Sequence, residues 1–204
     1  MQISFCRKIA ILAAVLGSLA FFVSGCNPPP PADDEGKEEK PKVVVTLSFF
    51  EDMVRQIGSD KIELKALVPV GVEPEEYEPV PADLRAINDA AVFIYNGHNI
   101  ERWLPRVIPD LEQRANCFAL GEHPSIKTIP LPDGPFAGEP DPHVWTDVAN
   151  AVIYGEQIAA ILSEIDPENK EYYREQADRY TEELRDLTTG SGIRWRKFPR
   201  KNVS

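Results

Sequence analysis

The fold is decided by the stretch VVVTLSFFEDMVRQIG, residues 43–58. Its first half, Val43–Leu47, is a continuous run of mostly β-branched residues that is typical of a strand covered on both faces. Its second half places apolar residues at helical spacing. We expect a helix with a capping box formed by Ser48 and Glu51, ended by Gly58. A buried strand that runs at once into a helix favours a parallel α/β sheet.

The same alternation of strand-like and helix-like segments continues along the chain. We expect further strands at Ile62–Val68, Ala91–Tyr95 and Cys117–Leu120, and helices beginning near Pro81, Glu101, Asp147 and Asp166. Prolines break the helical region 101–111 into short pieces, and the proline- and glycine-rich residues 121–141 predict a loop with a small hairpin. This order predicts one α/β lobe with a four-stranded, mainly parallel sheet flanked by helices.

Residues 1–26 have the composition of an export signal, with two basic residues before an apolar run. The run ends in Val23-Ser24-Gly25-Cys26, which resembles the bacterial lipobox. We therefore expect Cys26 to carry a lipid anchor at the new N-terminus. The alternative, a plain membrane helix, is disfavoured because the run is shorter than the roughly 20 apolar residues that a span requires.

Four further segments follow this signal. Residues 27–42 combine four prolines with charged residues and predict a disordered tether. Residues 43–165 form the α/β lobe, and residues 166–188 form a long linker helix with a narrow apolar seam. The basic residues 189–204 contrast with an acidic body, and we interpret them as a sign that the chain is truncated or altered there.

Charge and missing motifs exclude several functions. The formal net charge is -11, which argues against a nucleic-acid partner and favours a cation as the ligand. The sequence has no glycine-rich phosphate loop, no G-x-S-x-G, no paired C-x-x-C and no H-E-x-x-H, so we expect that it is not an enzyme. Cys117 has no partner for a disulfide in the mature chain, and we expect it to be a small buried hydrophobe.

The loop GVEPEEYEPVPADL, residues 71–84, gathers Glu73, Glu75, Glu76 and Glu78 between prolines. Such a run is ordinarily a solvated acidic face, but the prolines and Tyr77 stiffen it, which also fits a metal ligand. His143 lies in DPHVWTD, residues 141–147, where a proline fixes the backbone and Trp145 and two aspartates stand close by. We consider it a metal ligand, with a solvated loop histidine as the alternative.

His98 and His123 are weaker candidates, because turn histidines are ordinarily just exposed. In parallel sheets ligands bind beyond the carboxyl ends of the strands. The loops 71–79, 96–99 and 121–143 should therefore open on the same edge.

Three motifs, in this order, resemble one known family. The first is approximately G-x-D-P-H-x-Y-E-P-x-P-x-D, which is matched at Gly71, Pro74, Tyr77, Glu78, Pro79, Pro81 and Asp83. The second and third are Y-N-G-x-x-L-E-x-W-L and D-P-H-x-W-x-D-P-x-N-A, matched at Tyr95–Gly97, Glu101, Trp103–Leu104, Asp141–Trp145, Asp147, Asn150 and Ala151. They resemble the zinc- and manganese-binding solute-binding lipoproteins of bacterial ABC importers, the ZnuA/TroA-like family.

The resemblance covers about Val43–Leu187 and implies two α/β lobes joined by a long helix, with the metal between them. It places one ligand at His143 and another at Glu75, where the family has histidine. Glutamate is a harder ligand than imidazole, so this departure favours manganese or iron over zinc. We expect that the second lobe is not part of this chain, so that at most two of four ligands lie here. His98, Glu76, Tyr77 and Trp145 are candidates to line the site.

The resemblance implies an extracytoplasmic, lipid-anchored, monomeric component of an ABC importer. It would capture a divalent cation, Zn²⁺ or Mn²⁺, and deliver it to a permease with its ATPase. The alternative is a surface adhesion or scaffold lipoprotein that has lost transport. A hydrolase based on Glu75 and Glu76 is the weakest possibility, because nothing holds adjacent glutamates at catalytic separation.

Overall fold

The structure is a computed structural model that describes residues 39–189. The export signal, Cys26, most of the tether and the tail after Thr189 lie outside the described residues. The chain divides into the units Met1–Glu39 and Lys40–Ser204, and residues 40–189 belong to the second.

Four parallel strands form the sheet. They are β1 (Lys42–Val45), β2 (Glu63–Ala66), β3 (Val92–Tyr95) and β4 (Cys117–Ala119). Their order is β2-β1-β3-β4, so β1 and β3 are central, with Val44 paired to Lys65 on one side and to Phe93 on the other. The predicted parallel sheet is confirmed.

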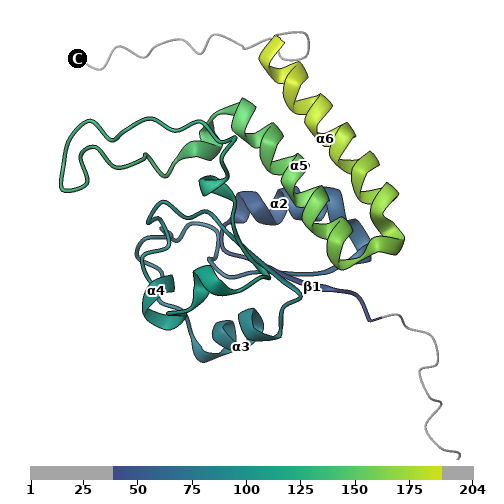
Figure 1. Cartoon of the computed structure of the whole chain (residues 1–204), viewed down its shortest axis with the longest axis horizontal. Coiled ribbons are helices and arrows are strands. Elements are labelled where there is room, and N and C mark those ends of the chain that lie inside the picture. Colours follow the sequence, from purple (N-terminus) through teal and green to yellow (C-terminus); the bar gives the residue numbers. More distant parts are fainter. Residues whose placement is uncertain (1–38, 190–204) are drawn as a thin grey trace, which may run out of the picture. The chain divides into compact units, whose positions relative to one another are not determined.

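Helices cover both faces of this sheet (Figure 1). On one face lie α2 (Ser48–Gly58), α5 (Val148–Ile165) and α6 (Lys170–Thr189), and on the other lie α3 (Pro81–Asp89) and α4 (Leu104–Val107). Short 3-10 turns lie at Ser59–Lys61, Leu111–Gln113, Leu120–Glu122, Val144–Thr146 and Pro167–Asn169. Side chains alternate across the strand, so Val43 and Val45 join the core under α2 and α5, whereas Val44 joins the core with Phe93. This burial on both faces explains the uninterrupted valine run.

The start of α2 differs from the prediction. Ser48 does not cap the helix; Leu47 is the N-cap residue and makes no side-chain cap bond. Leu47 is buried with an extended backbone, and its carbonyl accepts the first helical bond from the Glu51 N–H at 3.0 Å. The Glu51 carboxylate instead accepts a hydrogen bond from Arg55, one turn later. The strand runs directly into the helix, which leaves Ser48 inside the first turn.

The end of α2 at Gly58 is confirmed, but the reason is a close approach. A Cβ at Gly58 would lie 2.5 Å from Cδ1 of Ile62, and Gly58 itself has right-handed backbone geometry. The helix therefore ends with a glycine because the chain turns back tightly toward β2. Any larger residue at position 58 would require the Ile62 side chain to move.

Three further expectations concern residues 101–141. The short pieces predicted in 101–111 are confirmed, since α4 spans only four residues. Cys117 is only half-buried, because β4 is an edge strand, so the prediction of a buried cysteine is wrong. A small hairpin is confirmed by hydrogen bonds from Leu131 N to Glu139 O and from Asp141 N to Ile129 O, both 2.8 Å long.

The last two helices pack against each other and against α2. The Asp147 carboxylate caps α5 by accepting the Ala149 N–H at 2.8 Å. The apolar seam predicted on α6 is buried at Tyr173 and Ala177. Near the end of the helix it becomes exposed, and Leu187 is 43% exposed. Within residues 39–189 no helix combines the length and hydropathy needed to cross a membrane.

We predict that Tyr173→Ala lowers the free energy of unfolding by about 3–5 kcal/mol, because this ring is fully buried between α6 and the core. The neighbouring Tyr172 is only partly buried and lies 5.9 Å from the Lys61 amine, so Tyr172→Ala should cost less than half as much. Urea denaturation measures both. Equal losses would show that α6 is not docked through Tyr173.

Candidate metal site

The predicted ligand segments meet at the carboxyl edge of the sheet. A hollow of about 230 Å³ is lined by Leu47, Ser48, Phe49, Val68, Pro69, Gly71, Val72, Pro74 and Trp145. The loop that follows β2 and the segment around His143 therefore share one surface, as predicted for a parallel sheet. The Trp145 ring stacks on Phe49, with centroids 4.8 Å apart, which fixes the wall next to His143.

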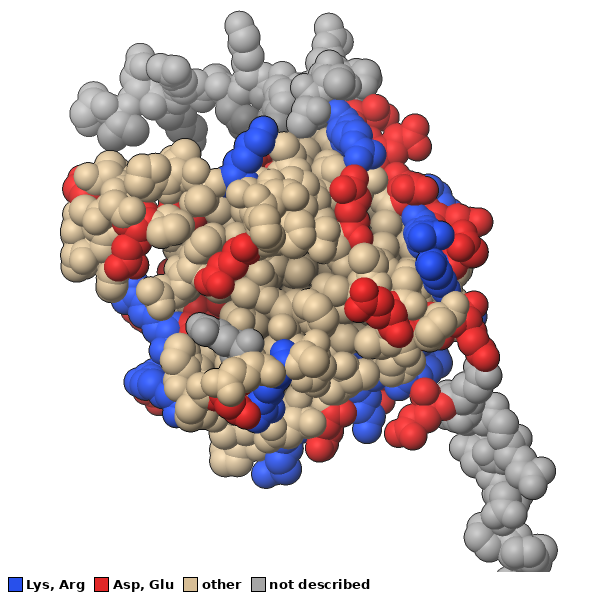
Figure 2. Space-filling view, in the orientation of Figure 1, with Lys and Arg blue, Asp and Glu red and all other residues tan. Residues whose placement is uncertain are grey.

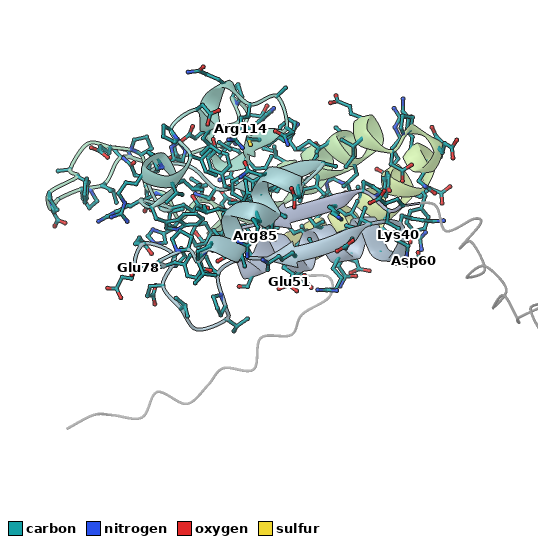
Figure 3. The ribbon with its side chains drawn as sticks, turned by 90° about the horizontal axis from the view of Figure 1, so that it is seen from below. Lys40, Glu51, Asp60, Glu78, Arg85 and Arg114 are labelled. Atoms are coloured by element: carbon teal, nitrogen blue, oxygen red, sulfur yellow. The ribbon has the colours of Figure 1, made fainter. Side chains whose placement is uncertain are left out.

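Glu75 differs from the other glutamates of its loop. Glu73, Glu76 and Glu78 are exposed, and Figure 3 shows Glu78 at the periphery of the molecule. Glu75 is partly buried, and its Oε2 is one of two buried side-chain polar atoms in residues 39–189 with no hydrogen-bond partner. A buried carboxylate oxygen without a donor is costly unless a cation neutralises it.

His143 is held through its backbone and one ring nitrogen. Its N–H and its Nδ1 lie 2.9 and 2.7 Å from Oδ1 of Asp141. Hydrogen bonds from the backbone and ring of His143 lower the pKa of Asp141, which keeps this carboxylate ionised. A ring that donates from Nδ1 presents a lone pair at Nε2, the arrangement in which histidine binds a metal.

Tyr77 is directed toward α3. Its hydroxyl donates to Oδ2 of Asp83 at 2.7 Å, and its ring meets the Trp103 ring edge-on at 5.5 Å. Burial and the adjacent Asp83 raise the pKa of Tyr77 to about 12. Burial works against the ionised Asp83, but bonds from Tyr77, Val80 and Lys65 outweigh it and lower the pKa of Asp83. Tyr77 therefore anchors the acidic loop to α3, and its role in lining the site stays a prediction.

His98 is directed toward the neighbouring loop. Its Nε2 donates to the Gly121 carbonyl at 2.8 Å, and its backbone N–H donates to Glu122 Oε1 at 2.7 Å. These bonds hold Gly97, His98 and Asn99 in left-handed conformations, with φ of 81°, 50° and 61°. Because Nε2 is already engaged, a contribution of His98 or of the exposed Glu76 to the site stays a prediction.

Glu101 links the residues that follow β1 and β3 at this edge of the sheet. The sequence pattern does not predict it as a site residue. Its carboxylate is buried and accepts hydrogen bonds from Thr46 Oγ1 at 2.6 Å, Asn96 N at 2.8 Å and Gly97 N at 3.1 Å. Burial raises the pKa of Glu101 to about 7, against these hydrogen bonds, which lower it. A signal was present: an acid between the apolar residues Ile100 and Trp103 needs buried partners.

The described residues bring two predicted ligand positions to this edge. Nowhere in residues 39–189 do three or more histidine, cysteine, aspartate or glutamate side chains gather closely enough to hold a metal. Within these residues the candidate site is therefore the pair of predicted ligands, His143 and Glu75, and their joint binding of a metal stays a prediction.

This chain belongs to the family described as zinc-uptake complex component A, periplasmic (ZnuA), whose pattern matches residues 43–203. It is 34% identical over 185 residues to the manganese ABC transporter substrate-binding lipoprotein PsaA of Streptococcus pneumoniae, covering 89% of this chain and 59% of that protein. It is 36% identical over 185 residues to the iron ABC transporter substrate-binding lipoprotein MtsA of Streptococcus pyogenes serotype M1, covering 89% and 58%.

Solved structures show the same fold. The periplasmic zinc binding protein TroA from Treponema pallidum superimposes with a TM-score of 0.67 at 26% identity, covering 74% of this chain and 53% of that chain. Zn(II)-bound AdcA from Streptococcus pneumoniae gives 0.63 at 29% identity, covering 74% and 32%. The chain thus spans somewhat more than half the length of the two lipoproteins and about half of TroA.

We predict that Glu101 makes stability depend on pH. The folded carboxyl keeps its proton up to about pH 7, whereas the ordinary value is 4.5. The folded state binds the extra proton between these values, so the contribution of Glu101 to stability falls as pH rises through this window. The free energy of unfolding, relative to Glu101→Gln, should decrease by about 3 kcal/mol from pH 4.5 to 7.5.

Urea denaturation at a series of pH values measures this difference. Glu122→Gln is the matched control, because the Glu122 side chain is 51% exposed and its removal should leave the pH profile nearly unchanged. Parallel pH profiles for the wild type and Glu101→Gln would contradict the prediction.

Proposed function

We propose that this chain is the metal-capturing lobe of a substrate-binding component of an ABC importer. It takes up a divalent cation as cargo and delivers it to a permease that works with an ATPase. One observation carries the proposal: the buried, unpartnered Oε2 of Glu75 lies in the loop that shares a hollow with the His143 segment. Membership of the zinc-uptake family supports it.

The cargo is Zn²⁺ or Mn²⁺, bound by Nε2 of His143 and the carboxylate of Glu75. Relatives carry the names manganese and iron transporter lipoprotein, and the AdcA structure holds Zn(II). A carboxylate in place of an imidazole shifts preference from zinc toward manganese or iron. Two protein ligands fill half of a tetrahedral site, so residues 39–189 alone bind the cation weakly, and the remaining ligands come from outside these residues.

The proposed organisation keeps the predicted boundaries. Cys26 carries a lipid that anchors the protein outside the cytoplasm, and residues 27–42 tether the lobe formed by residues 43–165. Residues 166–188 link this lobe to a second one, and the chain acts as a monomer. The lipoprotein names of the relatives and the docking of α6 on α5 and α2 support this organisation.

Other functions have less support. FimA of Streptococcus parasanguinis, 34% identical over 199 residues, is named a metal ABC transporter substrate-binding lipoprotein, so an adhesion or scaffold role without transport is not favoured. A hydrolase lacks support because Glu76 is exposed and Glu75 has no hydrogen-bonded partner at Oε2. Basic and acidic side chains are intermixed around the rim of the face drawn in Figure 2, which gives no reason to propose a nucleic-acid partner.

We predict that Glu75→Gln and His143→Ala each weaken Mn²⁺ binding at least tenfold, because each removes one of two protein ligands. Glu73→Gln and His123→Ala are matched controls that change an exposed glutamate of the same loop and a second loop histidine. They should leave the affinity within about twofold. Isothermal titration of metal-free protein with Mn²⁺, and separately with Zn²⁺, measures the four variants.

The same titrations test the incomplete site. The wild-type chain should bind with a dissociation constant above the micromolar range. One-to-one binding below one micromolar would contradict the claim that two ligands are missing. Equal effects of Glu75→Gln and Glu73→Gln would remove Glu75 from the site.

A further inference from the structure

Two buried asparagines hold the backbone on either side of His143. Asn96 Nδ2 donates to the carbonyl of Pro142 at 3.0 Å, and Asn150 Nδ2 donates to the carbonyl of Val144 at 2.9 Å. Asn96 is fully buried, and Asn150 is 1% exposed. The residue before His143 and the residue after it are therefore each fixed by an amide that water does not reach.

Asn150 also fixes the approach to the hairpin. It lies in the first turn of α5, where its Oδ1 accepts the Lys127 N–H at 2.9 Å and its Nδ2 donates to the Lys127 carbonyl at 2.8 Å. A single side chain thus bonds to the backbone at the two ends of the loop that carries the hairpin. This accounts for a buried asparagine inside a helix, a position that is otherwise unfavourable for this residue.

Asn96 is itself anchored in the sheet. It follows β3, its N–H donates to Glu101 at 2.8 Å, and its carbonyl accepts the Gly121 N–H at 2.9 Å. A Cβ at Gly121 would lie 2.5 Å from the Asn96 carbonyl oxygen, so this approach requires glycine. These bonds link the Pro142 carbonyl to both central strands, because Glu101 also accepts a hydrogen bond from Thr46 at the end of β1.

His143 needs this support because its own side chain is 53% exposed. Its ring is held by Asp141, which lies within the same segment and cannot fix that segment relative to the sheet. We infer that Asn96 and Asn150 are positioning residues, which hold the His143 backbone so that its imidazole is oriented for the cation before the cation arrives. The inference rests on the proposed function, and ordering the ligand in advance removes an entropy cost from binding.

The variants Asn96→Ala and Asn150→Ala test this inference. Asn116→Ala is the matched control, since Asn116 Nδ2 also donates to a backbone carbonyl, that of Ala90, at 3.0 Å. That bond joins the segments leading into β3 and β4, at the opposite edge of the sheet. Circular dichroism identifies which variants fold, and Asn150→Ser replaces Asn150→Ala if the alanine variant does not.

The first measurement is ¹⁵N NMR of the histidine rings in the metal-free chain at pH 8, where imidazole is neutral. We expect the wild-type His143 ring to be ordered and to carry its proton at Nδ1. In Asn96→Ala and Asn150→Ala the ring should become mobile and lose this tautomer preference, and in Asn116→Ala it should not. A mobile wild-type ring would overturn the inference whether or not the variants fold. Folded variants whose His143 ring is identical to that of the wild type would also overturn it.

The second measurement is Zn²⁺ affinity by competition with a chromophoric chelator. We expect about 10- to 100-fold weaker binding for both positioning variants, as for other groups that orient a metal-binding histidine, and less than twofold change for Asn116→Ala. If the wild type binds neither Zn²⁺ nor Mn²⁺ but the two variants show the expected changes of the His143 ring, the proposed function is rejected and the positioning role is supported. Normal Zn²⁺ affinity in both variants would reject the positioning role alone.

Discussion

The buried carboxylate of Glu101 joins the two central strands at the edge where the candidate site lies. It accepts hydrogen bonds from Thr46 at the end of β1 and from the N–H groups of Asn96 and Gly97 after β3. Burying this group is costly, and its pKa rises to about 7 because burial outweighs the hydrogen bonds. In return, Glu101 fixes the N–H groups of Asn96 and Gly97, where the chain enters a loop with three consecutive left-handed residues.

Hydrogen bonds connect Glu101 to the segment around His143 through Asn96 and backbone carbonyl groups. Asn96 bonds to Pro142, and Asn150 independently bonds to Val144. The hydrogen bond from Tyr77 to Asp83 ties the acidic loop, which contains Glu75, to α3. The two candidate ligands are therefore carried by irregular segments that hydrogen bonds hold against the sheet and its helices, which is how a loop can present ligands without regular secondary structure.

Local pattern was enough to predict the fold but only part of the site. The valine run at β1 and the apolar spacing of α2 and α5 depend on neighbours in sequence, so the sheet and most helices were predicted correctly. The roles of Glu101 and Asn96 depend on partners 55 and 46 residues away, which no local pattern shows. Ser48 was wrongly expected to cap α2, because the sequence does not show that the buried Leu47 already occupies the cap position.

The central claim is that one cation binds between the Glu75 loop and the His143 segment, and that this chain supplies only part of its coordination sphere. The most direct test is a crystal structure of the chain with Mn²⁺, with the ion located by its anomalous scattering. The account predicts one peak about 2.0–2.3 Å from Nε2 of His143 and from a carboxylate oxygen of Glu75, with water completing the shell. A manganese ion bound to neither residue, for example between Glu101 and Glu122, would contradict it.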